Sequence, residues 1–539
     1  MTRSPVGIFP PEARETRSRL FNALEQAFTI RFEARRPGEW GDLAAAVVFA
    51  SQESACDAPC PVLLIAGGDD IADTPLRVRF SSEAAVDRRL RGQVLEEKSG
   101  SHVGRLPPEP GDVVLATAAE MPVWLLRRSN RHERFIVSTS PDELLETEGL
   151  RDHLRSGRFL GLLPLVHFLR QVAAEAAWVE PPLRAAFIVD DPNLRSTSYG
   201  YVRFSELIQN ARRNGYHVVL ASVPLDYGFA HPRTTRIFRQ HASLVSMAIH
   251  GNNHEHLELL RADSGPRARA IAAQALRRTA AFEKRAGLPV ARVMCPPHEV
   301  CSEAMLDALF RLGFDGVTTA RLLRAAKGKA SPARLLAEWD PAQFVAGGLP
   351  ILGRRTFARP LDDIVLRAYL NQPLLLFGHH HDLADGFARL ETAAARVNAL
   401  GSVHWGSLTD ICRTNFATRR ETSTLRIRLY ARRVAVDIPA DVDQLSVEIP
   451  AVASTNGPMV LACDARTAPV WPSEVEPTRI SFQGPFASTV QLQLLPGEPL
   501  QPEAIAPPAW QLWPIVRRGL AEGRDRMTPL RSRLARRRT

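Results

Sequence analysis

The stretch LRAAFIVDDPN, residues 183–193, decides the fold of the central part of this chain. Its apolar run predicts a buried strand, and the pair Asp190 and Asp191 marks the end of that strand. Downstream, strand patterns alternate with helix patterns, and the helix patterns over residues 198–215 and 266–287 each stop at a glycine. This repeat predicts a parallel sheet, either open or closed into a barrel. In barrels of this type the active site lies at the carboxyl ends of the strands.

The rest of the chain extends this core on both sides. A length of 539 residues is too great for one hydrophobic core, and 45% hydrophobic with 23% charged residues is typical of a folded globular protein. We divide the chain into an N-terminal helix and linker (1–40), a small α/β or β-rich domain (41–150), the (β/α) barrel (151–415), an antiparallel β-sandwich (416–500) and a Pro- then Arg-rich tail (501–539). The roles of the N-terminal and C-terminal domains do not follow from their sequences.

Three more segments carry chemically active side chains directly after predicted strands. They are IHGNNHEH (249–256), VMCPPHEV (293–300) and LLLFGHHHDL (374–383), and they contain seven of the 15 histidines. Taken singly, each is explained by a turn, a helix cap or a solvated face. Because all of them fall at strand ends of one β/α domain, together they predict a shared pocket.

The residue types in these segments suit a metal site. Imidazole and carboxylate groups are zinc ligands, and three protein ligands leave an open position for water or substrate. The i, i+4 spacing of His250 and His254 lets two imidazoles converge on one ion. A second carboxylate beside the ion can act as a base, and a histidine across the pocket can act as an acid.

The order of these motifs resembles the polysaccharide deacetylase (NodB-homology, chitooligosaccharide deacetylase-like) family over residues of about 185–385. That family carries Thr-Phe-Asp-Asp-Gly-Pro, then His-Ser/Thr-x-x-His, then Arg-x-Pro-Tyr, and a late Leu-x-His. The resemblance implies a distorted (β/α) barrel. It also implies a metal-dependent hydrolase that removes acetyl from an N-acetylated sugar or polysaccharide precursor, with zinc as the expected metal.

Carried over residue by residue, the resemblance implies a complete set of roles. The three metal ligands are Asp191, His250 and His254. Asp190 is the base that takes a proton from the attacking water. The acid that protonates the leaving amine comes from the late histidine run. We favour His379, which immediately follows the strand, over His381.

This chain departs from the family pattern at several positions. The glycine after the Asp pair is missing, and Gly251 stands where the family has serine or threonine. Cys295 replaces the arginine that pairs with the base in the family, so we expect the base to lack that partner. His298 replaces the aromatic residue of the same motif and is a candidate extra ligand, substrate contact or replacement acid. The metal site is therefore better supported than the catalytic apparatus.

Two other functions remain open on the same fold. One is hydrolysis of a non-sugar amide, which the altered third motif allows. The other is a non-catalytic carbohydrate-binding or assembly module.

Charge and cysteine content bear on partners and location. Nine arginines between residues 517 and 538, against Glu522 and Asp525, supply +7 of the net charge of +10. Such a tail predicts a solvated segment or peripheral contact with an anionic membrane. The rest of the chain has no basic and aromatic pattern for nucleic acid. With six cysteines and no secretory signal pattern, we expect a cytoplasmic protein that is either free or peripheral to the inner membrane; its oligomeric state does not follow.

Overall fold

The computed structural model describes most of the chain in ten stretches. These are residues 4–49, 58–66, 75–98, 103–128, 132–173, 178–320, 335–358, 363–452, 458–474 and 476–536. The chain divides into two compact units. Unit 1 comprises Met1–Val179, Arg324–Trp339 and Asp362–Leu370; unit 2 comprises Glu180–Leu323, Asp340–Leu361 and Asn371–Thr539.

Unit 1 is built on a nine-stranded mixed sheet with the order β2-β1-β3-β4-β9-β8-β7-β5-β6. Its strands are β1 (Ser4–Phe9), β2 (Ile30–Ala34), β3 (Ala45–Phe49), β4 (Val62–Ile65), β5 (Leu76–Phe80), β6 (Val94–Glu97), β7 (Val113–Ala118), β8 (Met121–Arg128) and β9 (Glu133–Val137). Pairings from β2 to β9 are parallel, and those from β9 to β6 are antiparallel.

The first 40 residues differ from the expected helix and linker. β1 lies inside the sheet between β2 and β3, and only α1 (Pro11–Glu15) and α2 (Ser18–Ala27) are helical. The helix α3 (Leu163–Val172) also belongs to unit 1, although its sequence was assigned to the barrel. The buried run Val6 to Phe9 explains the difference, because a strand buried on both faces has no alternation to reveal it.

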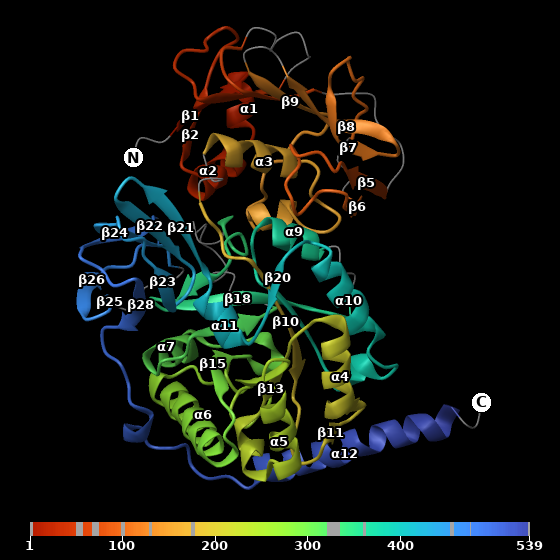
Figure 1. Cartoon of the computed structure of the whole chain (residues 1–539), viewed down its shortest axis with the longest axis vertical. Coiled ribbons are helices and arrows are strands. Elements are labelled where there is room, and N and C mark those ends of the chain that lie inside the picture. Colours follow the sequence, from red (N-terminus) through yellow and green to blue (C-terminus); the bar gives the residue numbers. More distant parts are fainter. Residues whose placement is uncertain are drawn as a thin grey trace. The chain divides into compact units, whose positions relative to one another are not determined.

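Seven parallel strands close into a barrel in unit 2 (Figure 1). They are β10 (Leu183–Asp190), β13 (Val218–Ser222), β14 (Val245–Ile249), β15 (Val290–Met294), β16 (Gly316–Thr319), β18 (Leu349–Thr356) and β19 (Leu374–Gly378). Each pairs with the next in this order, and β19 pairs with β10 to close the ring. The predicted barrel is thus confirmed, and the sheet is closed rather than open.

Helices follow the strands as the periodicity predicts. They include α4 (Phe204–Asn214), α5 (Pro232–Gln240), α6 (Gly265–Ala286), α7 (Glu303–Arg311), α10 (Ala388–Asn398) and α11 (Leu408–Arg413). Gly215 and Gly287 end α4 and α6 in the left-handed conformation, with φ of 64° and 62°. Glycine takes this conformation without the cost of a β-carbon, so the predicted glycine stops are confirmed.

The sequence patterns did not reveal one barrel strand, β18. It contains Pro350 and Gly353, two residues that weaken a strand pattern, and carries two consecutive arginines before its last residue, Thr356. Pro350 is nevertheless accommodated, and Leu349 to Leu352 are buried between β16 and β19. This strand supplies a residue of the candidate site.

The region after the barrel contains two four-stranded sheets. Their orders are β21-β22-β24-β27 and β23-β28-β25-β26. The strands are β21 (Phe416–Glu421), β22 (Thr424–Leu429), β23 (Arg433–Asp437), β24 (Gln444–Ile449), β25 (Met459–Cys463), β26 (Arg466–Val470), β27 (Thr478–Gln483) and β28 (Thr489–Pro496). All pairings in these two sheets are antiparallel except that of β22 with β24. A separate sandwich domain stays a prediction, since these strands belong to the same compact unit as the barrel.

The Arg-rich tail contains a long helix, α12 (Trp513–Arg536). Three of its side chains, Arg518, Glu522 and Asp525, are buried. None of the helices in the described stretches is long and apolar enough to cross a bilayer.

Candidate metal centre and active site

The two adjacent aspartates lie where β10 ends. Asp190 is the last residue of the strand and is buried, with 1% of its surface exposed. Asp191 takes a left-handed conformation with φ of 62°, and its N–H donates to the carbonyl of Ala221 at 3.1 Å. A non-glycine residue in this conformation costs about 1–3 kcal/mol and persists only where its surroundings enforce it. Backbone strain is therefore concentrated at the predicted first ligand.

The two histidines predicted to bind the metal come from the loop after β14. His250 directly follows the strand, and His254 again has a positive φ, of 59°. The buried carboxylate of Glu258 accepts the backbone N–H groups of Asn252, Asn253 and His254 at 2.9–3.1 Å. This carboxylate closes the loop from inside and holds His254 toward His250.

Gly251 stands between these histidines for a steric reason. Its φ is 65°, and a β-carbon there would lie 2.7 Å from Pro297 Cγ and 3.0 Å from Glu258 Oε2. The close approach to Pro297 explains why this chain has glycine where the family has serine or threonine. The glycine at position 251, which departs from the family motif, is therefore required by the packing of this loop.

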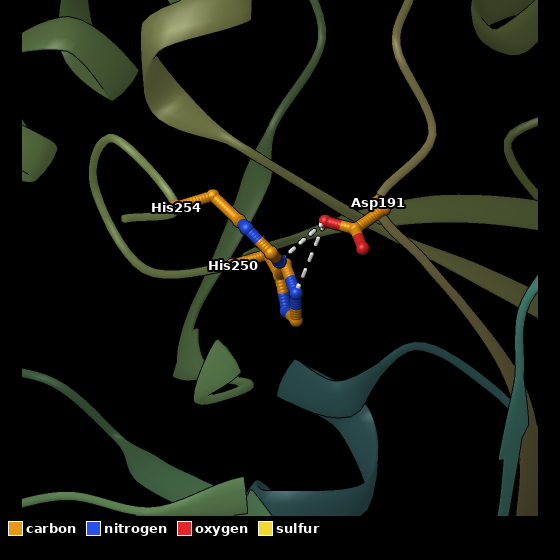
Figure 2. A group of neighbouring side chains, drawn as sticks. All are labelled: Asp191, His250 and His254. Atoms are coloured by element: carbon orange, nitrogen blue, oxygen red, sulfur yellow. Dashed lines mark ion pairs between the residues drawn. The ribbon is translucent and has the colours of Figure 1, made fainter. Parts of the chain in front are cut away.

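The three predicted ligands converge, as Figure 2 shows. Asp191 Oδ1 lies 2.9 Å from His254 Nε2 and 3.4 Å from His250 Nε2. One potential ligand atom from each residue lies within 4.8 Å of the others. Asp191 Oδ1 is buried, and the Nε2 atoms of both imidazoles lie beside it. A buried carboxylate oxygen next to two imidazole nitrogens fits a bound divalent cation.

The charges at this cluster influence one another. Burial by itself raises the pKa of Asp191, but His250 and His254 outweigh it and hold that pKa well below its usual value. Burial likewise lowers the pKa of His250, yet the carboxylates of Asp190 and Asp191 leave it raised overall. The cluster thus keeps an ionised carboxylate, the form that binds a cation.

Asp190 has a cationic partner that the sequence analysis missed. Arg354 of β18 donates to both carboxylate oxygens of Asp190, at 3.0 and 2.9 Å, and it is fully buried. Arg354 also donates to both oxygens of Glu299 and lies 4.2 Å from the centre of the Phe377 ring. The expectation that the base lacks an arginine is wrong, because a different strand supplies it.

Cys295 is a core residue. It is fully buried, Thr318 Oγ1 lies 3.3 Å from its sulfur, and burial raises the pKa of its thiol to about 12. A neutral thiol packed among apolar side chains is inert. Cys295 therefore occupies the position of the family's arginine but, as a neutral thiol, does not replace its positive charge.

His298 lies at the edge of the site. It is exposed, has a φ of 60°, and its ring centre is 5.6 Å from that of His254 and 5.1 Å from that of His256. Burial and the neighbouring histidines lower the pKa of its imidazole. The structure brings it beside the ligand loop, and its three candidate roles stay open.

The late histidine run divides between two places. His379 follows β19, is 45% exposed, and places Nε2 3.9 Å from Asp191 Oδ2. His381 instead lies against His380, with ring centres 3.8 Å apart. Of the two candidate acids, His379 is therefore the one that the structure brings to the aspartate.

The helix α12 also reaches this cluster. Arg518 donates to Asp226 at 2.8 Å and lies 3.9 Å from Asp191 Oδ1. Arg517 Nη2 donates to the carbonyl of Asn253 at 3.3 Å. Nothing in the local sequence pattern could place these arginines at a site more than 250 residues earlier.

No family model matches this chain, and no curated protein matches it in sequence. Solved structures do align with it. Agd3, described as a novel carbohydrate deacetylase, aligns over 89% of this chain and 98% of its own, with 9% identity and a TM-score of 0.48. A putative polysaccharide deacetylase from Mycobacterium smegmatis aligns over 43% of this chain and 90% of its own, with 16% identity and a TM-score of 0.32. A family 4 carbohydrate esterase from Streptomyces lividans aligns over 42% and 93%, with 13% identity and a TM-score of 0.26.

The motif order, the closed seven-stranded barrel and the convergence of Asp191, His250 and His254 agree with one another. The order of its motifs resembles that of the polysaccharide deacetylases, and the closed barrel is the fold that this resemblance implied.

Proposed function

We propose that the protein is a metal-dependent hydrolase of non-peptide C–N bonds that removes acetyl from an N-acetylated sugar or polysaccharide precursor. The observation that carries this proposal is the pairing of two different carboxylates on adjacent residues. Asp191 faces two histidines, and Asp190 faces a buried arginine. Asp191 is thus placed to bind a cation, and Arg354 holds Asp190 next to it.

Asp191, His250 and His254 would hold the metal, for which we propose zinc. A divalent cation there would lower the pKa of water and polarise the amide carbonyl. Asp190, fixed by Arg354, takes the proton from the attacking water. His379, which is 45% exposed and places Nε2 3.9 Å from Asp191 Oδ2, donates a proton to the departing amine.

The proposal is tested by acetate release from N-acetylglucosamine oligomers, together with metal analysis of the purified protein. Asp190→Asn should keep its metal and lose about 100-fold or more in kcat, because it removes the general base. His250→Ala and His254→Ala should each bind one equivalent of metal less than wild type. The same metal content in wild type and both histidine variants would overturn the ligand assignment.

The same assay separates the alternatives. Oligomer binding without acetate release would favour a non-catalytic carbohydrate-binding module. Release of acid from simple amides but not from acetylated sugars would favour a non-sugar amidohydrolase, to which the exposed His298 in the third motif would contribute.

A further inference from the structure

A second group of possible metal ligands lies outside the site described above. It consists of His380 and His381, at the start of the short helix η6 (His380–Leu383), and Asp525 of α12. One potential ligand atom from each of these residues lies within 4.8 Å of the others. None of the three belongs to the ligand set of the first cluster, so the group needs its own explanation.

The distance between His380 and Asp525 leaves room for an ion between the two side chains. His380 Nε2 and Asp525 Oδ1 are 3.7 Å apart, which is too long for a hydrogen bond. Two atoms bound to one zinc ion in tetrahedral geometry are separated by about 3.3–3.6 Å, given bonds of about 2.0–2.2 Å. In the first cluster, the comparable distance between His250 Nε2 and Asp191 Oδ1 is 3.4 Å.

The orientation of His380 is set by its packing. The residue is 1% exposed, and the ring of Tyr199 meets its ring edge-on at 4.6 Å. A β-carbon on Gly200 would lie 2.2 Å from His380 Nδ1, so the backbone of Gly200 covers that nitrogen. Nε2 is therefore the nitrogen that faces Asp525, and the buried Nδ1 has no hydrogen-bond partner within the described stretches.

Asp525 is presented to this histidine by a buried helix face. It is 6% exposed, and its Oδ1 accepts a hydrogen bond at 3.0 Å from Nε of Arg524, whose side chain is 69% exposed. A buried carboxylate costs free energy unless a cation or hydrogen bonds compensate it. The neighbouring His381 is exposed and supplies the third potential ligand atom.

We propose that His380, His381 and Asp525 form a second divalent-cation site, suited to zinc, that fastens α12 to the barrel. Consecutive histidines then serve different sites, since His379 faces Asp191 while His380 and His381 face α12. An ion there holds the helix that brings Arg517 and Arg518 onto the first cluster. The proposal goes beyond the deacetylase function and does not depend on it.

The experiment is metal analysis of the full chain after dialysis against zinc. Wild type should bind two equivalents, and Asp525→Asn and His381→Ala one each. Because His381 is exposed, His381→Ala removes a donor without disturbing the core. Glu522→Gln is the matched control, since Glu522 is a buried carboxylate of the same helix that pairs with Arg526, and it should retain two.

A second readout follows the helix itself. Zinc should slow tryptic cleavage within α12 at least several-fold in wild type and in Glu522→Gln, but not in Asp525→Asn. The proposal is overturned if Asp525→Asn and His381→Ala bind as much zinc as wild type, or if zinc does not alter cleavage. Loss of one equivalent in His254→Ala alone, with none lost in Asp525→Asn, would keep the first site and remove the second.

Discussion

Two substitutions that weaken the family motif are explained by single contacts. Gly251 leaves space for Pro297, and the arginine missing at Cys295 is supplied from β18 as Arg354. A guanidinium thus still lies beside Asp190, although it comes from a different position in the chain than the family motif places it. Motif matching along the sequence cannot detect such an exchange, because it compares neighbours in the chain rather than in space.

Arg354 should therefore act as a positioning residue for Asp190. Removing it in Arg354→Met leaves the buried carboxylate of Asp190 and the partly buried one of Glu299 without their shared cation, which costs about 3–5 kcal/mol of stability. Arg354→Lys should retain the fold and restore part of the activity. Its kcat should fall with little change in KM, since a lysine cannot pair with both oxygens of Asp190. Thermal melting and acetate-release kinetics measure the two effects; an unchanged kcat in both variants would contradict the role.

At the scale of elements, α12 has two opposite faces. Arg518, Glu522 and Asp525 are spaced four and three residues apart and are buried. The other face carries exposed apolar side chains at similar helical spacing, which are Trp513 (61%), Val516 (41%), Leu520 (65%) and Met527 (49%). The tail is therefore not the wholly solvated segment that its charge allowed, and its exposed stripe is unusual for a surface helix.

We propose that this stripe, with the arginines around it, binds an anionic membrane surface. Amphipathic helices with apolar and arginine-rich faces lie in the interface of anionic bilayers. The full chain should sediment with vesicles containing phosphatidylglycerol and not with neutral ones, and 0.5 M salt should weaken the binding. Trp513→Ser with Leu520→Ser should reduce it, with Trp471→Ser, an exposed tryptophan elsewhere in unit 2, as the control. Equal binding by a chain ending at Pro514 would disprove the idea.

For the molecule as a whole, acid should destabilise unit 1 through a buried histidine. His167 of unit 1 is 7% exposed and lies against Trp124 and Phe135. Burial lowers its pKa to about 4, against an ordinary value of about 6.5. The folded state therefore binds this proton more weakly than the unfolded state does. The free energy of unfolding that depends on keeping His167 neutral is therefore at its full value above about pH 6.5, and it decreases as the pH falls toward 4.

The loss should amount to about 3 kcal/mol of the free energy of unfolding at pH 4. Urea unfolding followed by tryptophan fluorescence at pH 7 and pH 4 measures it. His167→Gln has no charge to gain, so its stability should fall less between these two pH values. An equal fall in the variant and the wild type would show that other groups set the acid limit.

The sequence by itself determined the repeating β/α core and the three candidate ligands. Strand periodicity, the glycine helix stops and the i, i+4 histidines are local features, and a closed parallel barrel brings strand ends together wherever they lie in the chain. How the site is completed depends on tertiary contacts. Arg354 comes from a strand hidden by Pro350 and Gly353, and Arg518 comes from a tail whose composition suggested solvation. Contacts between such distant segments depend on packing and charge pairing, which leave no periodic signal in the sequence.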